Sequence, residues 1–239
     1  MLCVRAFDGF VVNPRRARDV IAPAYDSLPP AERARYSSAH SDNYLNVMRT
    51  REDYVDEEVG TDEILRRNKQ NLSRRVQDGA VLPMKTRSLY VYRLSHGGHR
   101  QSGVVAELPV RDIDAGAVLK HERTRADREN LLVEYQCVVG ASSSPVALAY
   151  RADPRISELK AQVMDSTRPF LNVVSEDGVR QELWCVDDAP SIEMFLALFA
   201  TVPVAYLTDG HHRTAAASRY VERMEQGENP PVADGAWNH

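Results

Sequence analysis

The densest group of chemically active residues is Asp209-Gly-His-His-Arg213, near the C-terminal end of the sequence. An apolar run at 202–207 precedes it and an alanine-rich run follows it, which predicts a buried strand, a tight turn and the start of a helix. Unpaired backbone N–H groups and the positive end of the helix dipole attract anions at such a junction. The turn therefore predicts a phosphate site, with Gly210 and His211 against the anion and Arg213 as a bidentate clamp. In the alternative interpretation, Asp209 only caps the helix.

A second polar cluster, Leu119 to Arg128, lies between a strand-like segment and a predicted helix. His121 and Glu122 are candidates for moving a proton, and the cations around them are suited to an anionic substrate or phosphate. These cations are Lys120, Arg123, Arg125 and Arg128. Position 125 is Arg, so the zinc-binding pattern H-E-x-x-H is incomplete. In the alternative interpretation, the cluster is the charged start of a helix capped by Thr124. Because the two clusters carry complementary groups, we expect them to form halves of one phosphate-handling site.

The composition is that of an ordinary globular protein. The 239 residues carry a net charge of −4, and basic residues are scattered among acidic ones, which argues against a surface that coats nucleic acid. The three cysteines, Cys3, Cys137 and Cys185, are far apart and indicate reduced thiols rather than disulfides or a zinc site. No apolar run reaches the length of a membrane span, and the N-terminus does not have the pattern of a signal peptide. We therefore expect a cytoplasmic protein without nucleic-acid or membrane partners, and the oligomeric state stays open.

Apolar periodicity and turn residues predict an α+β fold in which helices flank a mixed sheet. We expect one domain over 1–226 and a loose tail over 227–239. The turn His96-Gly-Gly-His99 is interpreted as the polar loop of a hairpin rather than as a metal site. The expected helices cover 28–36 with Ser27 as the cap, 52–77 as one or two helices, 126–139, 156–164, 192–199 and 211–225. The expected strands cover 3–12, 45–48, 88–94, 101–110, 145–150, 171–174, 179–186 and 202–207.

Five motifs, in order along the chain, resemble the bacterial and archaeal family called domain of unknown function 1015. They are Ala22-Pro-Ala-Tyr-Asp26, Asn46-Val-Met-Arg49, His121-Glu-Arg-Thr124, Asp127-Arg128 and Asp209-Gly-His-His-Arg213. The resemblance implies that Tyr25, Asp26 and Thr124 line a substrate pocket, whereas the proline-rich sequence around Tyr25 by itself indicates only a loop. Family members continue well past the last motif, so we expect this chain to be a shortened member whose activity depends on what the further region supplies.

The last motif is also similar to the phosphate-binding motif of the ParB and sulfiredoxin superfamily, which includes kinases of free serine. The similarity implies a ParB/sulfiredoxin-like strand, turn and helix that binds ATP or ADP with Mg²⁺. By this analogy Glu122 is the general base, Asp209 and His212 help to place the metal or phosphate, and Arg213 stabilises the transferring charge.

The activity that these resemblances imply is a nucleotide-dependent phosphotransferase acting on a small hydroxylated metabolite such as serine. One alternative is a phosphoserine phosphatase that uses His121 or His211 as the proton donor. Another is a nucleotide-binding switch without catalysis, and a third is an inactive remnant.

Overall fold

The computed structural model describes residues 1–23, 25–54, 57–142 and 144–227, without the side chain of Asp26. Within this part, the strands are β1 (Phe10–Val12), β2 (Val81–Pro83), β3 (Leu89–His96), β4 (His99–Val105), β5 (Val118–Leu119), β6 (Ala147–Tyr150), β7 (Leu171–Val174), β8 (Arg180–Val186) and β9 (Ala205–Asp209). The α-helices are α1 (Ala17–Val20), α2 (Pro30–Ala39), α3 (Thr61–Gln77), α4 (Val110–Asp114), α5 (Ala126–Val139), α6 (Pro154–Ser166), α7 (Ala189–Phe199) and α8 (His211–Glu225). Short 3-10 helices cover Pro14–Arg16, Tyr25–Ser27, Tyr44–Val47 and Arg51–Asp53.

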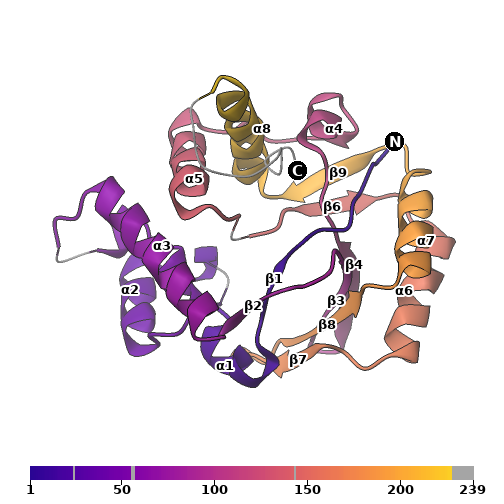
Figure 1. Cartoon of the computed structure of the whole chain (residues 1–239), viewed down its shortest axis with the longest axis horizontal. Coiled ribbons are helices and arrows are strands. Elements are labelled where there is room, and N and C mark those ends of the chain that lie inside the picture. The colour runs from indigo at the N-terminus through magenta and orange to yellow at the C-terminus, as the bar shows by residue number, and fades with distance from the viewer. Residues whose placement is uncertain (24, 55–56, 143, 228–239) are drawn as a thin grey trace.

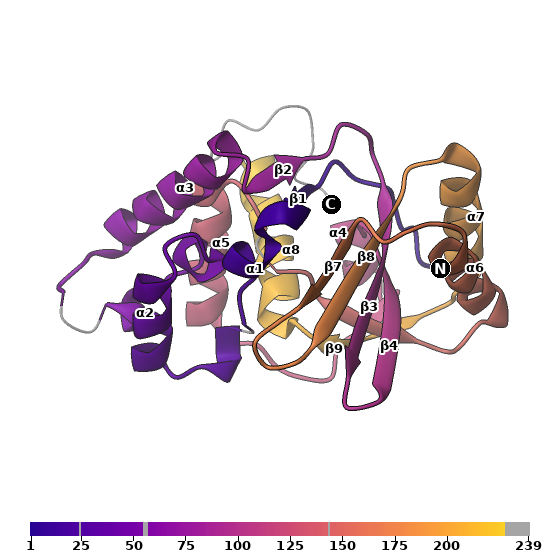
Figure 2. The same cartoon turned by 90° about the horizontal axis from the view of Figure 1, so that it is seen from below.

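The described strands form three sheets, and both parallel and antiparallel pairs occur, which confirms the predicted α+β fold. Strands β4, β3, β8 and β7 form an antiparallel sheet in that order, and β1 pairs with β2. In the third sheet, β9 lies between β5, to which it is parallel, and β6, to which it is antiparallel. Figures 1 and 2 show α2 and α3 at one end of the molecule and α6 and α7 at the other, with the sheets between them.

The main hydrophobic core lies between the two larger sheets and helices α6 and α7. Buried residues alternate with more exposed ones in β7 and β8, as the period of two in a half-buried strand requires. The fully buried members of this core include Leu89 and Val91 of β3, Ile156 of α6, Phe195 of α7 and Leu207 of β9. Burial of side chains of this size contributes roughly 1.5–3 kcal/mol each, so the core fixes the position of β9 and of the turn that follows it.

Helices α3, α5 and α8 pack in a row, so that α8, which follows β9, is linked through α5 to the N-terminal helix α3. Helix α8 packs against α5 and α4, and α5 also packs against α3. Ion pairs join α5 to α8, with Glu129 Oε2 at 2.6 Å from Arg219 Nε and Glu134 Oε1 at 2.6 Å from Arg223 Nη1. Glu129 is buried, and a buried carboxylate is stable only with a well-placed partner. Its ion pair with Arg219 therefore favours one register of α5 against α8.

Several predicted segments were placed correctly, and others were wrong in type or extent. The strands expected at 101–110 and 202–207 cover His99–Val105 and Ala205–Asp209 in the structure. The hairpin of β3 and β4, the hairpin of β7 and β8, and helices α5, α6 and α7 confirm the sequence patterns. The segment 45–48 is not a strand but part of a 3-10 helix, because the side chain of Asn43 accepts the N–H of Leu45 and starts a tight turn.

The other differences lie at element boundaries. Only Phe10–Val12 of the expected strand 3–12 pairs as a strand, and residues 5 and 7 make single bridges. Helix α2 begins at Pro30 with Pro29 as its N-cap rather than after a cap at Ser27, because proline suits the first helical position. Helix α3 begins at Thr61 rather than at 52, after Gly60. The expected tail over 227–239 lies outside the described residues except for Gly227. No helix in the described part of the chain is long and apolar enough to cross a membrane.

Candidate functional site

The two polar clusters meet because β5 and β9 are parallel neighbours. Val118 pairs with Ala205 and Leu119 with Tyr206, so both strands end at the same edge of the sheet. The loop 120–125 leaves β5 there, and the turn 209–213 leaves β9 there. We call these two segments together the candidate site. The ends of parallel strands are where ligands bind in open α/β sheets.

Gly210 makes the turn from β9 into α8 possible. Its φ is +94°, in the left-handed region that favours glycine, and it is the N-cap residue of α8. A Cβ atom at this position would lie 2.7 Å from Cγ1 of Val146 and 3.1 Å from Nε and Nη2 of Arg213. The absence of a side chain therefore lets the guanidinium of Arg213 fold back across the turn.

Arg213 and Asp209 form an ion pair across this turn, with Nη2 and Oδ2 2.6 Å apart. Asp209 is 72% exposed and Arg213 is 29% exposed. No side chain caps the start of α8, so the interpretation of Asp209 as only a helix cap is wrong. The first helical hydrogen bond runs from the N–H of Thr214 to the carbonyl of Gly210, which leaves the N–H groups of residues 211–213 at the positive end of the helix.

His211 joins the two halves of the site. Its side chain is only 5% exposed, and its Nδ1 lies 3.6 Å from Oε2 of Glu122, which is 60% exposed. The ring of His121 packs edge-on against the ring of His211, with centroids 4.4 Å apart. Nε2 of His211 and Nε of Arg213 are both buried, and neither has a hydrogen-bond partner among the described residues. Such buried polar atoms are rare unless a ligand or water satisfies them.

His212 connects the helix to the loop of the other cluster. Its Nε2 accepts the backbone N–H of Arg125 at 3.2 Å. Because Nε2 accepts, the neutral ring carries its proton on Nδ1. His212 thus positions the loop 120–125 against the first turn of α8. The role in metal or phosphate placement that the resemblance implies for it stays a prediction.

The cations of the second cluster differ in their surroundings. Arg125 pairs with Asp127, with Nη2 and Oδ2 2.6 Å apart, and this hydrogen bond lowers the pKa of Asp127. Arg123 and Arg128 are exposed and have no ion pair among the described residues, so both are free for an anion. Thr124 does not cap α5, because the N-cap residue is Arg125 and no side chain bonds there.

Tyr25, which was predicted to bind substrate, lies in a different network. Its hydroxyl is 2.9 Å from Oγ1 of Thr50 and donates to Oδ2 of Asp53 at 3.1 Å. The guanidinium of Arg33 stacks over its ring at 4.0 Å. Burial raises the pKa of Tyr25 to about 12, which keeps the hydroxyl protonated as a donor. The side chain of Asp26, the other predicted residue of this motif, lies outside the described residues.

The chain matches the family described as "Protein of unknown function (DUF1015)" over residues 4–239. The chain belongs to this family. The family predicted from the five motifs is thereby confirmed. Comparison with curated proteins and comparison with solved structures each gave no match.

The Mg²⁺ that the resemblance implies stays a prediction for this DUF1015 chain. Among the described residues, no group of three or more His, Cys, Asp or Glu side chains is arranged to hold a metal ion. Mg²⁺ in nucleotide sites keeps several waters and takes one or two carboxylates together with phosphate oxygens. Asp209, exposed at the turn, is suited to supply one such carboxylate. The metal would then enter with the phosphates rather than reside in the protein.

The sequence of this DUF1015 member gave no signal for one residue that shapes the site. Val146 lies just before β6, whose first residue pairs with Asp209, and its side chain lies against the face of Gly210. An apolar residue outside any motif has no chemical signature, so only the packing of β6 against β9 reveals it.

Replacing Gly210 with alanine is expected to lower the free energy of unfolding by about 1–3 kcal/mol, as for other residues forced into sparsely populated backbone regions. The added Cβ would also collide with Val146. Urea denaturation of the purified variant measures the change. Gly140→Ala is a matched control, because Gly140 has a φ of +76° with nothing within 4 Å of an added Cβ. Equal losses in the two variants would mean that the contact with Val146 contributes nothing.

Proposed function

We propose that this protein is a nucleotide-dependent phosphotransferase that acts on a small hydroxylated metabolite, with serine as the first candidate. The observation that supports it is the pair of buried nitrogen atoms, Nε2 of His211 and Nε of Arg213, left without partners at the start of α8. Both atoms lie beside backbone N–H groups that favour an anion. A phosphate group has enough acceptor oxygens to satisfy them together. The proposal includes a cytoplasmic location, where nucleotide and Mg²⁺ are both present.

The ion pair between Asp209 and Arg213 supports a role for Mg²⁺ with ATP or ADP. A phosphate that approaches Arg213 meets the carboxylate of Asp209 at the same place, only 2.6 Å from Nη2. Two negative groups repel one another at this distance unless a cation lies between them. Asp209 would hold Mg²⁺ together with the phosphates, and the cation would supply the positive charge that offsets this repulsion. Arg213 would then be free to contact the phosphate.

Glu122 is placed to act on the second substrate. Its carboxylate is exposed and approaches the buried His211 to 3.6 Å, so it can face solvent and the anion site at once. In the proposed reaction, Glu122 takes the proton of the substrate hydroxyl while the hydroxyl oxygen bonds to the transferred phosphorus. The bond from that phosphorus to the nucleotide oxygen breaks, and Arg213 neutralises the charge that develops.

Replacing Arg213 with alanine is expected to abolish stabilisation of the protein by nucleotide with Mg²⁺. A ligand at one hundred times its dissociation constant adds about 2.7 kcal/mol of stability, which a thermal-shift titration with ATP and ADP, with and without Mg²⁺, detects easily. The matched control is Arg155→Ala, because Arg155 is an exposed arginine of α6 that also pairs with a carboxylate, with its Nη2 2.7 Å from Oδ2 of Asp153. Unchanged nucleotide binding in Arg213→Ala would contradict the proposal.

The same assay, extended to turnover, separates the alternatives. Release of phosphate from phosphoserine without nucleotide would favour the phosphatase, in which His121 or His211 donates the proton. Their contact at 4.4 Å is the observation that keeps this second function under consideration. Saturable nucleotide binding with no turnover of any hydroxyl compound would favour the switch protein.

A further inference from the structure

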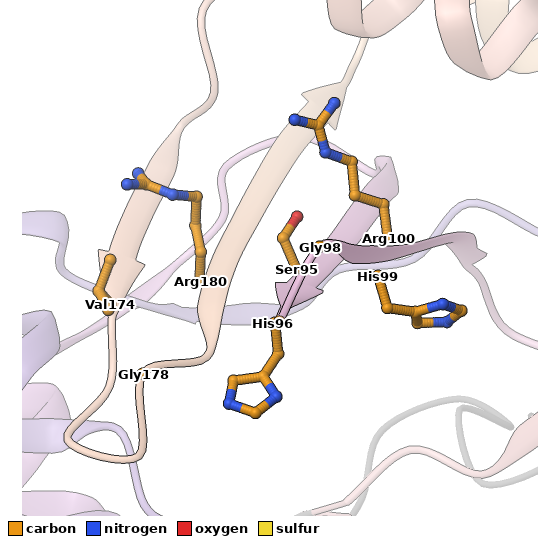
Figure 3. Close-up of a pocket in the computed structure, with 9 residues that line it drawn as sticks. Ser95, His96, Gly98, His99, Arg100, Val174, Gly178 and Arg180 are labelled. Carbon is orange, nitrogen blue, oxygen red and sulfur yellow. The ribbon is translucent and has the colours of Figure 1, made fainter.

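A basic hollow lies at the tips of two hairpins, apart from the candidate site. It has a volume of about 530 Å³ and lies between the turn of β3 and β4 and the turn of β7 and β8. Its lining includes Ser95, Arg100 and Arg180 (Figure 3) and contains no acidic residue. The volume falls in the range of small-molecule sites.

Sheet register places three of these residues in one row. Ser95 of β3 pairs with Arg100 of β4 on one side and with Arg180 of β8 on the other. Residues directly opposite one another in neighbouring strands share a face, so both guanidinium groups rise from the same face with the serine hydroxyl between them. Figure 3 shows the two arginine side chains on one side of the hairpins, with His96 and His99 pointing elsewhere. The Cα atoms of Arg100 and Arg180 are separated by two strand spacings, roughly 10 Å. Two long side chains can reach one ligand group across this distance.

The neighbouring row on the same face of the sheet, two residues along each strand, contains Arg93 and Glu182. There Arg93 pairs with Glu182, with Nε and Oε2 2.8 Å apart, and stacks over Trp184 at 4.8 Å. The hydrogen bond from Arg93 to Glu182 raises the pKa of Arg93. In this ion pair each side chain offsets the charge of the other. Helix α6 covers the face up to this row, where Met164 contacts Arg93, and ends at Ser166. Lys160 of α6 donates to the carbonyl of Ser102 in the same row, and Thr167, just after the helix, accepts from Trp184 Nε1. Among the described residues, no hydrogen bond or ion pair joins α6 to the row of Ser95.

Glu182 also lines the adjoining hollow with Arg93, Arg100 and Arg180. Its ion pair is with Arg93, so one carboxylate faces three arginines and the row of Ser95 stays basic. Arg180 Nη1 donates to the neutral Oδ1 of Asn172 at 2.8 Å, which orients the guanidinium without cancelling its charge. The side chain of Arg100 makes no ion pair or hydrogen bond among the described residues. The nearby Asp177 is engaged within its own turn, where its Oδ1 accepts from Ser175 Oγ at 2.6 Å and from the N–H of Val179 at 3.2 Å.

We propose that this hollow is a binding site for the phosphate group of a small phosphorylated molecule, held by Arg100 and Arg180 with the hydroxyl of Ser95 between them. Two arginines match the charge of a phosphate monoester, about −1.5 to −2 at neutral pH. A carboxylate carries a single charge and leaves one guanidinium unmatched. Arginine forks fit phosphate oxygens bidentately. The site does not depend on the proposed phosphotransferase function.

Titration of the full chain with inorganic phosphate at constant ionic strength tests the proposal. Arg213→Ala serves as the background, so that the candidate site loses its proposed phosphate clamp. We expect saturable shifts of the backbone amide NMR signals of residues 95–100 and 178–182, and acetate at the same ionic strength should bind at least tenfold more weakly. Arg100→Gln and Arg180→Gln should each weaken phosphate binding at least tenfold.

The matched control is Arg155→Gln, because Arg155 is exposed on α6 and pairs with Asp153 outside this hollow. It should leave the phosphate affinity unchanged. Both test arginines are exposed, so folded variants are expected, and unchanged melting temperatures confirm this. Absence of saturable shifts, equal binding of acetate, or undiminished binding in Arg180→Gln would each overturn the proposal. If phosphate bound to the unmodified chain but not to Arg213→Ala, the phosphate would belong to the candidate site. That result would also overturn the proposal.

Discussion

Replacing Asp53 with alanine is expected to lower the free energy of unfolding by about 3–5 kcal/mol, the cost of breaking a buried ion pair by removing one partner. Oδ1 of Asp53 lies 2.8 Å from Nε of Arg33, and the two side chains are only 2% and 6% exposed. The substitution leaves the buried guanidinium of Arg33 with only Glu52 as a counter-charge, an exposed carboxylate whose Oε2 lies 3.6 Å from Nη2. Urea denaturation monitored by circular dichroism measures the loss.

The network around Asp53 makes this effect large. Oδ2 of the same carboxylate accepts the N–H of Thr50 at 2.8 Å and the hydroxyl of Tyr25 at 3.1 Å. The Nη1 of Arg33 donates to the carbonyl of Leu28 at 2.9 Å. One carboxylate thus connects three segments that have no regular pairing with one another. Removing it leaves several buried donors without an acceptor at once.

A double-mutant cycle tests whether the pair itself is responsible. The variant with both Arg33→Ala and Asp53→Ala should lose less stability than the two single losses added together, because no charge remains buried. Asp53→Asn is a milder variant that retains an acceptor, should the alanine variant not fold. The matched control is Asp127→Ala, which breaks an exposed pair and should leave the unfolding midpoint nearly unchanged. Additive losses in the cycle would contradict the assignment.

The elements around the candidate site could be predicted from the sequence because their signals are local. Helix α5 and the strand, turn and helix at 205–225 follow from apolar spacing and one glycine. That the two polar clusters meet was predicted from their chemistry alone. The physical cause is the parallel pairing of β5 with β9, which the two residues of β5 are too few to reveal by pattern.

The parts that could not be predicted depend on contacts between distant segments. Tyr25 and Asp53 are 28 residues apart, and Arg33 and Asp53 are 20 apart, in loops and short helices that have no periodicity. The basic row of Arg100, Ser95 and Arg180 requires the register of two hairpins, and a slip of one residue would place these side chains on opposite faces. The strand predicted at 45–48 failed because a single side-chain bond from Asn43 overrides the apolar pattern.

Replacing Glu122 with glutamine is expected to lower the rate of phosphate transfer by about 10²–10⁴-fold, the usual contribution of a positioned general base. The expectation depends on the proposed phosphotransferase function. Glutamine keeps the size of the side chain and can still approach Nδ1 of His211, which lies 3.6 Å from the carboxylate. It cannot accept the proton of the substrate hydroxyl. The measurement is turnover of nucleotide with serine and other small hydroxylated compounds, at saturating nucleotide and Mg²⁺.

Nucleotide affinity is the control that separates chemistry from binding. Because Glu122 belongs to the loop after β5 and the phosphate contacts belong to the start of α8, the affinity for nucleotide with Mg²⁺ should change by less than about threefold, well under 1.4 kcal/mol. Glu193→Gln, an exposed glutamate on α7, should change neither quantity. A loss of turnover together with a matching loss of nucleotide binding would show that Glu122 supports the anion site rather than the proton transfer. Unchanged turnover would move the base to His121 or His211, whose rings are in contact at 4.4 Å.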